Sequence, residues 1–145
     1  MYKRQVFHLG DHDDDAVALQ QEFPKLPFHY VKGNNDYRVD TPSQKLVRLG
    51  GKTLLLTHGH KQRVYWNYDT ISYWAEEQGA DVVLFGHTHM PLWEAGGRVA
   101  LFNPGSISLP RGGTLPTFGI LTMEDGRIEG AIMEYWNKEH FKRIN

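Results

Sequence analysis

Four short apolar segments of this chain each run directly into a turn that carries polar side chains able to bind a metal. Segments of this length, bounded by glycine, are typical of buried strands. Because sites in open α/β sheets form where the strands end, the pattern predicts that these polar side chains meet at one edge of a sheet. The segments and their turns are Val6–Leu9 with Gly10-Asp11, Phe28–Val31 with Gly33 to Asp36, Lys52–Thr57 with His58 to His60, and Asp81–Phe85 with Gly86 to His89.

The segments between and after these strands predict an α/β fold. Acidic residues precede Ala16 and suit the first turn of a helix that ends near Phe23. Apolar residues recur at helical spacing between positions 65 and 78, and Gly79 suits a C-cap. Hairpins join the later strands, so we expect a mixed sheet, or two sheets packed face to face, flanked by helices. The expected hairpin turns are Gly50-Gly51, Gly96-Gly97 and Glu124 to Gly126.

The composition is that of an ordinary globular domain. The chain has 145 residues, of which 40% are hydrophobic and 23% charged, and its formal net charge is -1. This length fits one domain with its own core. Neither a basic stripe nor an apolar run of about 18 residues occurs, so we expect no nucleic-acid and no membrane partner. The absence of cysteine excludes disulfides and a thiolate metal site, and it fits a reducing, cytoplasmic setting. The composition is compatible with a homo-oligomer.

The polar side chains at the strand ends form a ligand set for transition metals. Imidazole nitrogens with carboxylate and amide oxygens suit zinc, manganese or iron(II), and a carboxylate can bridge two such ions. Each turn alone is a weak signal, because a Gly-Asp after a strand is usually only a turn and asparagine tolerates left-handed backbone. The prediction depends on the ordered set, in which every member follows an apolar strand. The candidate ligands are Asp11, Asn34, His58, His87 and His89.

In this order and spacing, the four motifs resemble motifs two to five of the calcineurin-like metallophosphoesterases, in the small bacterial and archaeal phosphodiesterase branch. They are Gly-Asp, Gly-Asn-Asn-Asp, Thr-His-Gly-His and Gly-His-Thr-His, and Asn103 to Ser106 resembles a segment that follows the last motif there. The resemblance covers roughly residues 6 to 135. It implies a layered β-sandwich flanked by helices, two divalent metal ions (Mn, Zn, Fe or Ni) and hydrolysis of a small phosphate ester, either a phosphodiester or a phosphomonoester.

The resemblance also implies a role for each candidate ligand. Asp11 would bridge both ions. Asn34, His58 and His87 would complete the second metal site, and His89 would belong to the first. The nucleophile would be hydroxide held by the metals, because such ions lower the pKa of water.

Three residues are candidates for roles beside the metals: Asn35, Asp36 and His60. Many members of the family carry a histidine at the position of Asn35, where it acts as a general acid. Asparagine cannot donate a proton as an acid, so we expect a preference for substrates with good leaving groups. Asp36 is expected to position a neighbouring group, and His60 to contact a metal-bound group or the substrate.

The first motif of the family, an Asp-x-His at the end of an earlier strand, has no counterpart ahead of Asp11. The resemblance therefore implies that the domain lacks its first strand and helix, together with two ligands of the first metal site. We expect at most one well-formed site and impaired activity in this chain. Met1 to Gln5 has no apolar pattern and abuts the first strand. We expect residues 1–5 to be a leader foreign to the domain, residues 6–135 to be the domain, and residues 136–145 to be a polar tail that frays.

Other residues have simpler interpretations. His8 and His29 lie inside apolar strands and are expected in the core, whereas His12 is close enough to the first motif to approach it. The run Asp13 to Asp15 is expected to be a solvated helix start, and His140 to have no function. The aromatic residues between positions 65 and 74 are expected in the core or an interface rather than in a substrate platform. Two alternatives to an enzyme stay open: a non-catalytic scaffold, known on this fold in a membrane-traffic coat, and a fragment that folds poorly.

Overall fold

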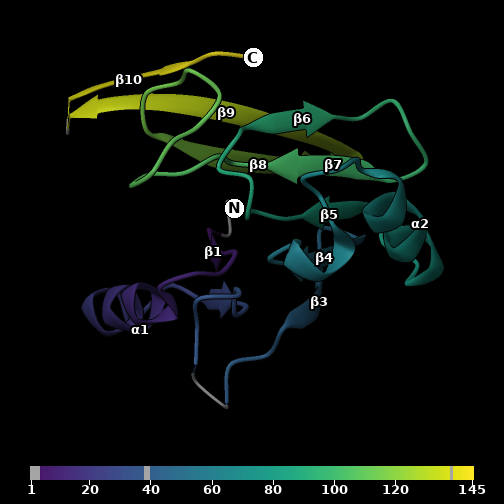
Figure 1. Cartoon of the computed structure of the whole chain (residues 1–145), viewed down its shortest axis with the longest axis horizontal. Helices are drawn as coiled ribbons and strands as arrows, with labels where there is room; N and C mark the ends of the chain where they lie inside the picture. Colours follow the sequence, from purple (N-terminus) through teal and green to yellow (C-terminus); the bar gives the residue numbers. More distant parts are fainter. Residues whose placement is uncertain (1–3, 38–39, 138) are drawn as a thin grey trace.

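The computed structural model describes residues 4–37, 40–137 and 139–145. Helices alternate with strands in the first half of the chain, and strands joined by turns make up the second half (Figure 1). In chain order the elements are β1 Val6–His8, α1 Asp13–Glu22, β2 Phe28–Tyr30, β3 Gln44–Leu49, β4 Lys52–Thr57, the 3-10 helix η1 His60–Gln62, α2 Asp69–Glu77, β5 Val82–Leu84, β6 Leu92–Glu94, β7 Ala100–Asn103, β8 Thr117–Glu124, β9 Arg127–Asn137 and β10 His140–Arg143.

A mixed five-stranded sheet in the order β3-β4-β5-β7-β6 forms the centre of the molecule. Strands β4, β5 and β7 are parallel, and the two outer strands pair antiparallel to them. The three consecutive leucines of β4, Leu54 to Leu56, are all fully buried. Alternate residues of a strand point to opposite faces, so Leu55 packs on one face of the sheet and its two neighbours pack on the other. Burial on both faces explains why the strand is apolar without alternation.

The two faces of this sheet are covered by different layers. Helix α2 covers one face through Ile71 and Ala75, four residues apart and both fully buried. It ends at Glu77 with Gln78 as its C-cap, and Gly79, the expected C-cap, follows with φ 72°; the N–H of Ala80 donates to the carbonyl of Ala75 at 3.0 Å. The antiparallel sheet β10-β9-β8 covers the other face, where Ile132 joins the core. The predicted layered α/β sandwich and its three hairpins are therefore confirmed.

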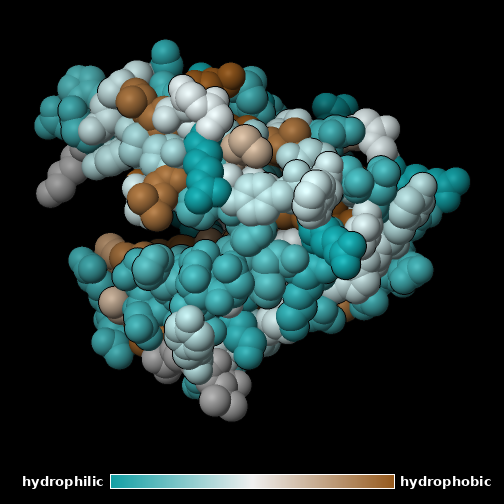
Figure 2. Space-filling model, in the orientation of Figure 1, coloured by the Kyte–Doolittle hydropathy of each residue, from teal (hydrophilic) through white to brown (hydrophobic). Residues whose placement is uncertain are grey.

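The first three elements form a small unit, residues 6–37, which we call the N-terminal unit. Val31 of this unit is fully buried in the core on the β8–β10 side of the central sheet, and Phe7 and Leu9 pack against that core. Among the described residues, its strands β1 and β2 pair with each other alone, in parallel, and each is three residues long and half-buried. Helix α1 buries only Asp13 and Ala16. The space-filling view shows a hollow with hydrophobic surface between this unit and the β8–β10 sheet (Figure 2). The remainder, β3 to β10 with α2, is called the sandwich below.

Some sequence expectations need correction. The helix predicted between positions 65 and 78 begins only at Asp69, because the chain first makes η1 and a turn. The tail after position 135 does not fray: Asn137 still lies in β9, and β10 pairs antiparallel with β9 from His140 to Arg143. Most of the expected leader, residues 1–3, lies outside the described residues.

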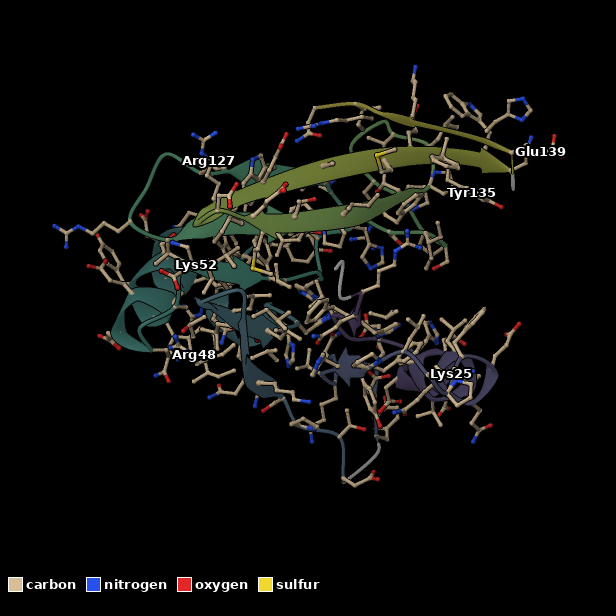
Figure 3. All side chains as sticks on the ribbon, turned by 180° about the vertical axis from the view of Figure 1, so that it is seen from behind. Lys25, Arg48, Lys52, Arg127, Tyr135 and Glu139 are labelled. Atoms are coloured by element: carbon tan, nitrogen blue, oxygen red, sulfur yellow. The ribbon has the colours of Figure 1, made fainter. Side chains whose placement is uncertain are left out.

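Most charged side chains are exposed to water, and Asp13 is a buried exception. Figure 3 labels five charged side chains on the ribbon. They are Lys25, Arg48, Lys52, Arg127 and Glu139. None of the helices in the described ranges is both long and apolar enough to cross a bilayer.

Candidate metal centre

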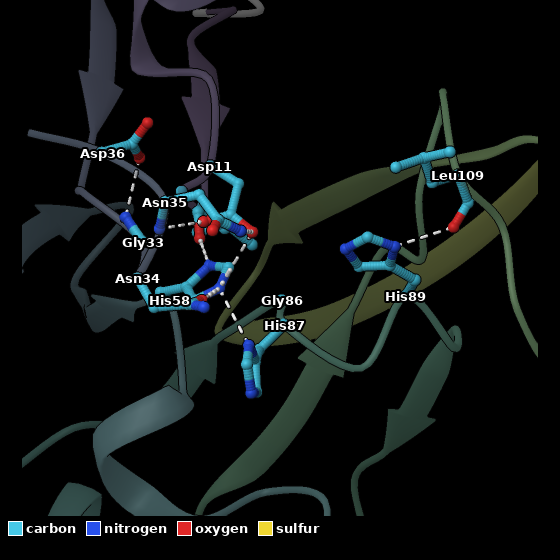
Figure 4. A network of polar contacts seen from close by, with 12 residues as sticks. Asp11, Gly33, Asn34, Asn35, Asp36, His58, Gly86, His87, His89 and Leu109 are labelled. Carbon is cyan, nitrogen blue, oxygen red and sulfur yellow. Dashed lines mark hydrogen bonds and ion pairs between the residues drawn. The ribbon is translucent and has the colours of Figure 1, made fainter.

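Four strand ends deliver polar side chains to one place, as the motif pattern predicted. Asp11 follows β1, Asn34 follows β2, His58 follows β4 and His87 follows β5 (Figure 4). Nε2 of the buried His58 lies at the centre of the group: it is 3.0 Å from Oδ1 of Asn34, 3.1 Å from Nδ1 of His87 and 3.5 Å from Oδ2 of Asp11. Two separate parts of the molecule thus meet at a single imidazole.

The proton positions on His58 explain why such a group suits a cation. Nδ1 of His58 lies 2.8 Å from the carbonyl oxygen of Leu9, which can only accept, so Nδ1 carries the hydrogen. In the neutral ring Nε2 then presents a lone pair, and it faces the carboxylate oxygen of Asp11 and the amide oxygen of Asn34, which are also acceptors. A proton on Nε2 can satisfy one of these atoms, whereas a metal ion can satisfy them together.

The separations between these atoms fit a shared ion. Two neighbouring ligand atoms, each about 2.1 Å from a metal ion, stand about 3.0–3.4 Å apart in octahedral or tetrahedral geometry. The contacts of His58 with Asn34 and His87, at 3.0 and 3.1 Å, fall in that range. Across the described residues, no three histidine, aspartate or glutamate side chains already enclose a common ion position. The side chains instead contact one another directly.

Asn35 holds the carboxylate of Asp11 at both oxygens. Its backbone N–H donates to Oδ1 at 3.0 Å, and its side-chain Nδ2 donates to Oδ2 at 3.1 Å. Burial alone would raise the pKa of Asp11, but the N–H of Asn35 and the nearby His58 outweigh it, so the pKa is lowered. Asp11 is therefore anionic and oriented at neutral pH. Asn35 contributes by positioning this carboxylate.

Asp36 ties the two loops of the N-terminal unit together. Its Oδ2 accepts from the N–H of Gly33 at 2.8 Å, and its Oδ1 accepts from the N–H of Asp13 at 2.9 Å. Asp13 is itself buried and accepts from the hydroxyl of Thr41 at 2.8 Å, so the acidic run is not uniformly solvated as expected. Asp14 and Asp15 are exposed.

The backbone at the candidate ligands is held in an unusual conformation. Asp11, His87 and His89 all have positive φ, at 58°, 68° and 58°. Left-handed backbone is uncommon for residues other than glycine and tends to occur where function requires a fixed side-chain direction. The site also depends on a close approach of two loops, because a Cβ on Gly33 would lie 2.2 Å from Oδ1 of Asp11.

His87 and His60 are neutral near pH 7, and neutral imidazole is the form that can bind a metal ion. Burial, followed by the nearby His58 and His60, lowers the pKa of His87 to about 4. Burial and the neighbouring His58 likewise lower the pKa of His60. The His60 ring centroid is 5.2 Å from that of His58 and 6.0 Å from that of His87, and its buried Nδ1 has no hydrogen-bond partner in the described structure.

His89 stands apart from the other four candidate ligands. Figure 4 shows it across a gap from Asp11, on the far side of His87. Its Nδ1 lies 2.8 Å from the carbonyl oxygen of Leu109, which fixes the hydrogen on Nδ1. Nε2 is thereby left as the lone-pair nitrogen, the same arrangement as at His58 and one that is typical of metal-binding histidines.

Two features of the site were not predicted from the sequence motifs. The first is Asn103, which is fully buried and donates from Nδ2 to the carbonyl of Gly86 and to the hydroxyl of Thr88. It thereby holds the turn that carries both His87 and His89. The resemblance of Asn103 to Ser106 to a family segment was the available signal, but it did not reveal this contact. The second is the pair Tyr65 and Arg111, described below.

The remaining histidines lie outside the group. His8 and His29 are half-buried in β1 and β2, rather than fully in the core. His29 stacks on the ring of Phe7 and bonds to Gln5 at 2.7 Å. His12 is exposed and lines a cavity of about 350 Å³ together with Asp13, Asp14, Asn35, Asp36 and Tyr37. His140 lies on the exposed strand β10.

Comparison with known proteins agrees with this geometry. The family model of the calcineurin-like phosphoesterase superfamily domain matches residues 2–126. The chain therefore belongs to the calcineurin-like phosphoesterase superfamily. This family is known for metal-dependent hydrolysis of phosphate esters, which agrees with the nature of the ligand set.

Individual relatives support the assignment. The chain is 37% identical over 121 residues to the probable metallophosphoesterase YsnB of Bacillus subtilis, covering 83% of this chain and 69% of that protein. It is 37% identical over 99 residues to the phosphodiesterase YfcE of Escherichia coli K12, covering 63% of this chain and half the length of that protein. A crystal structure of a predicted phosphoesterase from Streptococcus pneumoniae superposes with a TM-score of 0.79 at 28% identity, covering 97% of this chain and 80% of that one.

Proposed function

We propose that this chain belongs to an enzyme that hydrolyses small phosphate esters, diesters or monoesters, at a centre of two divalent metal ions. The observation that supports this most directly is the convergence of Asp11, Asn34 and His87 on Nε2 of His58. Nδ1 of His87 can donate a hydrogen bond to this nitrogen, but the oxygens of Asn34 and Asp11 are acceptors that face its lone pair. A metal ion would satisfy all of these lone pairs together.

The ligands divide unequally between the two ion positions. One ion would be held by Asp11, Asn34, His58 and His87, three of which contact Nε2 of the fourth, His58. The other would be held by Asp11 and His89, the remaining candidate among the described residues. We therefore propose one well-held ion and one weakly held ion, with slow turnover by this chain. Manganese, zinc, iron(II) and nickel all suit the nitrogen and oxygen donors.

The residues around the ions define what the chain itself contributes. Divalent ions at such a centre lower the pKa of water and stabilise the charge that develops on phosphate oxygens. Asp11 is kept anionic and fixed by Asn35, so it can serve both ions without rotating. Asn35 cannot supply a proton to a leaving group. We therefore propose that esters with good leaving groups, such as nitrophenyl esters, are hydrolysed faster than alkyl esters.

The test combines metal content with turnover. The purified chain would be dialysed against manganese or zinc, its metal content measured by elemental analysis, and its hydrolysis of bis(p-nitrophenyl) phosphate and p-nitrophenyl phosphate followed. We expect about one tightly held ion and slow turnover. Asp11→Ala should lose both, whereas Asp15→Ala, an exposed aspartate on α1, should lose neither. If Asp11→Ala kept more than about a tenth of the wild-type kcat, a loss below about 1.4 kcal/mol, Asp11 would not be the shared ligand.

A further inference from the structure

Arg111 lies beside the two histidines of the last metal motif, although it is far from them in sequence. Its backbone N–H donates to the carbonyl of His89 at 3.0 Å, two residues beyond the contact of Leu109 with Nδ1 of the same histidine. Its guanidinium donates through NH1 to the hydroxyl of Tyr65. Both the backbone and the side chain of Arg111 are therefore placed relative to the candidate metal centre.

Tyr65 connects Arg111 to the other histidine of that motif. Its hydroxyl donates to the carbonyl of His87 at 3.0 Å, and its ring lies edge-on to the His87 imidazole with the centroids 4.6 Å apart. Cζ of Arg111 lies 6.0 Å from the centroid of the Tyr65 ring. Because a phenol hydroxyl both donates and accepts, Tyr65 can hold the histidine turn and the guanidinium at once. This gives Tyr65 a positioning role that its exposed location, outside helix α2, would not suggest.

The Arg111 guanidinium has N–H donors that no group in the described residues accepts. Arg111 is exposed, and within the described ranges no carboxylate forms an ion pair with it. A guanidinium has five N–H donors, of which Tyr65 accepts one. The ordinary interpretation is a surface arginine that braces a loop, but the backbone bond to His89 already braces that loop. The side chain is thus ordered next to the centre without satisfying its charge.

With metal ions bound at the centre, electrostatics would determine what the Arg111 side chain binds. Two divalent ions and an arginine within about one Debye length repel one another, and an anion placed between them removes this cost. Guanidinium groups match the geometry of phosphate oxygens, which can accept two parallel N–H bonds. We infer that Arg111, positioned by Tyr65, binds the phosphoryl oxygens of the substrate that face away from the metal ions. This inference rests on the proposed function, and it adds a residue that selects for the phosphoryl group.

The experiment measures phosphate binding separately from metal binding. The manganese-loaded chain and its variants would be titrated with inorganic phosphate in a calorimeter, and the metal-free forms would be titrated with manganese. Arg111→Ala should weaken phosphate binding by roughly tenfold or more, the value of a charge-assisted hydrogen-bonded contact, and leave manganese affinity unchanged. Arg111→Lys keeps the charge but not the fork, so it should recover part of the loss. Tyr65→Phe should weaken phosphate binding by about threefold.

Arg98→Ala serves as the matched control, because Arg98 is an exposed arginine paired with Glu76 on α2. It should bind phosphate as the wild type does. If wild-type chain binds manganese and phosphate and Arg111→Ala binds both equally well, the inference is wrong while the proposed function stands. If the wild-type chain takes up no metal ion, the proposed function fails and the inference fails with it. A loss of manganese affinity in Arg111→Ala would show that Arg111 only supports the histidine turn.

Discussion

The N-terminal unit and the sandwich supply ligands to the same centre but are packed very differently. In the sandwich, His58 and His87 follow strands β4 and β5, whose last residues have almost no exposed surface. In the N-terminal unit, Asp11 and Asn34 follow three-residue strands that are only half-buried. Each fully buried leucine of the sandwich contributes about 1.5–3 kcal/mol, and the N-terminal unit has few comparable residues. The sandwich is thus a rigid half of the site, and the N-terminal unit is the half most easily displaced.

This difference implies that an ion would join the two halves. The polar contacts between them at the site are those of His58 with the carbonyl of Leu9, with Asn34 and with Asp11. Beyond the site, Val31, Phe7 and Leu9 are the apolar residues of the N-terminal unit that pack on the sandwich core. Parts of a protein with little buried apolar surface open locally at low free-energy cost. A ligand that binds only the closed arrangement stabilises it by mass action. The predictions below test this coupling, beginning with the largest expected effect.

Removing His58 should separate the two halves most completely. His58→Ala deletes the central ligand and also the bond to the carbonyl of Leu9. Residues that merely orient a ligand are worth about 10–100-fold in metal affinity, so we expect a loss of at least about a hundredfold, measured by calorimetric titration with manganese or zinc. His140→Ala, on the exposed strand β10, is the control and should bind normally. Equal metal affinity in the two variants would contradict a centre at His58.

Adding metal should protect the N-terminal unit and hardly affect the sandwich. At a free ion concentration of 100 times Kd, binding stabilises the closed form by about 2.7 kcal/mol. We expect backbone hydrogen exchange in residues 6–37 to slow by about a hundredfold at most, with β4, β5 and β7 unchanged. Mass spectrometry of the exchanging chain measures both regions in one sample. Uniform slowing over the whole chain would mean that the two halves already unfold together.

His87 and His89 come from the same turn but face different parts of the centre. His87 lies 3.1 Å from Nε2 of His58, whereas His89 is held by the loop that contains Leu109. His87→Ala should therefore weaken binding of the single tight ion by about tenfold more than His89→Ala does. Metal titration of both variants measures the difference. Equal losses would show that both histidines bind the same ion.

The close contact between the Gly33 and Asp11 loops can be tested by adding a methyl group at Gly33. A methyl group on Gly33 would overlap the carboxylate of Asp11, so Gly33→Ala must push the Asp11 loop away. We expect a cost of about 1–3 kcal/mol, as for other overpacked positions, expressed mainly as weaker metal binding. Gly96→Ala is the matched control, because no atom lies within 4 Å of its added Cβ. A normal metal affinity in Gly33→Ala would mean that the Gly33 loop can move away from Asp11 without displacing the metal ligands.

The sandwich was easier to predict from sequence than the details of the site. Continuous apolar segments such as Leu54 to Leu56 indicate strands buried on both faces, and glycine pairs locate the hairpins. The pairing of β10 was missed because its side chains are all exposed, so no apolar pattern distinguishes it from a solvated tail. Asp13 was misjudged for a related reason: its burial depends on Thr41, a partner distant in sequence.

The candidate ligands could be listed from motifs, but their partners could not. Asn35 next to Asp11, Asn103 beneath the histidine turn, and Tyr65 with Arg111 are contacts between loops, and loop geometry leaves no periodic trace in the sequence. Asn34 to Asp36 signalled a turn, without showing which atoms of that turn face Asp11. The ends of the strands fix where the backbone of each motif lies. Which side chains come into contact there depends on how the loops pack against one another.

The smallest expected effect is a pH dependence confined to the N-terminal unit. Burial lowers the pKa of His8 in β1 and, together with the nearby Lys45, the pKa of His29 in β2. The unfolded histidines, with ordinary pKa values near 6.5, then bind more protons than the folded ones below that pH. Stability from this source is therefore fully present above about pH 6.5 and is lost as the pH falls through the lowered folded values.

Between pH 7 and pH 5, hydrogen exchange in β1 and β2 of the metal-free chain should accelerate more than exchange in β4 and β5, after correction for the intrinsic rate. The groups that face His8 are Asp36, Asp15, Asp13 and His12. The three carboxylates favour its charged form and keep the effect small. His8→Gln removes the titration and should flatten the profile in β1. An unchanged profile in that variant would assign the pH dependence to His29 or to the ligands, and the N-terminal unit would then open for a different reason.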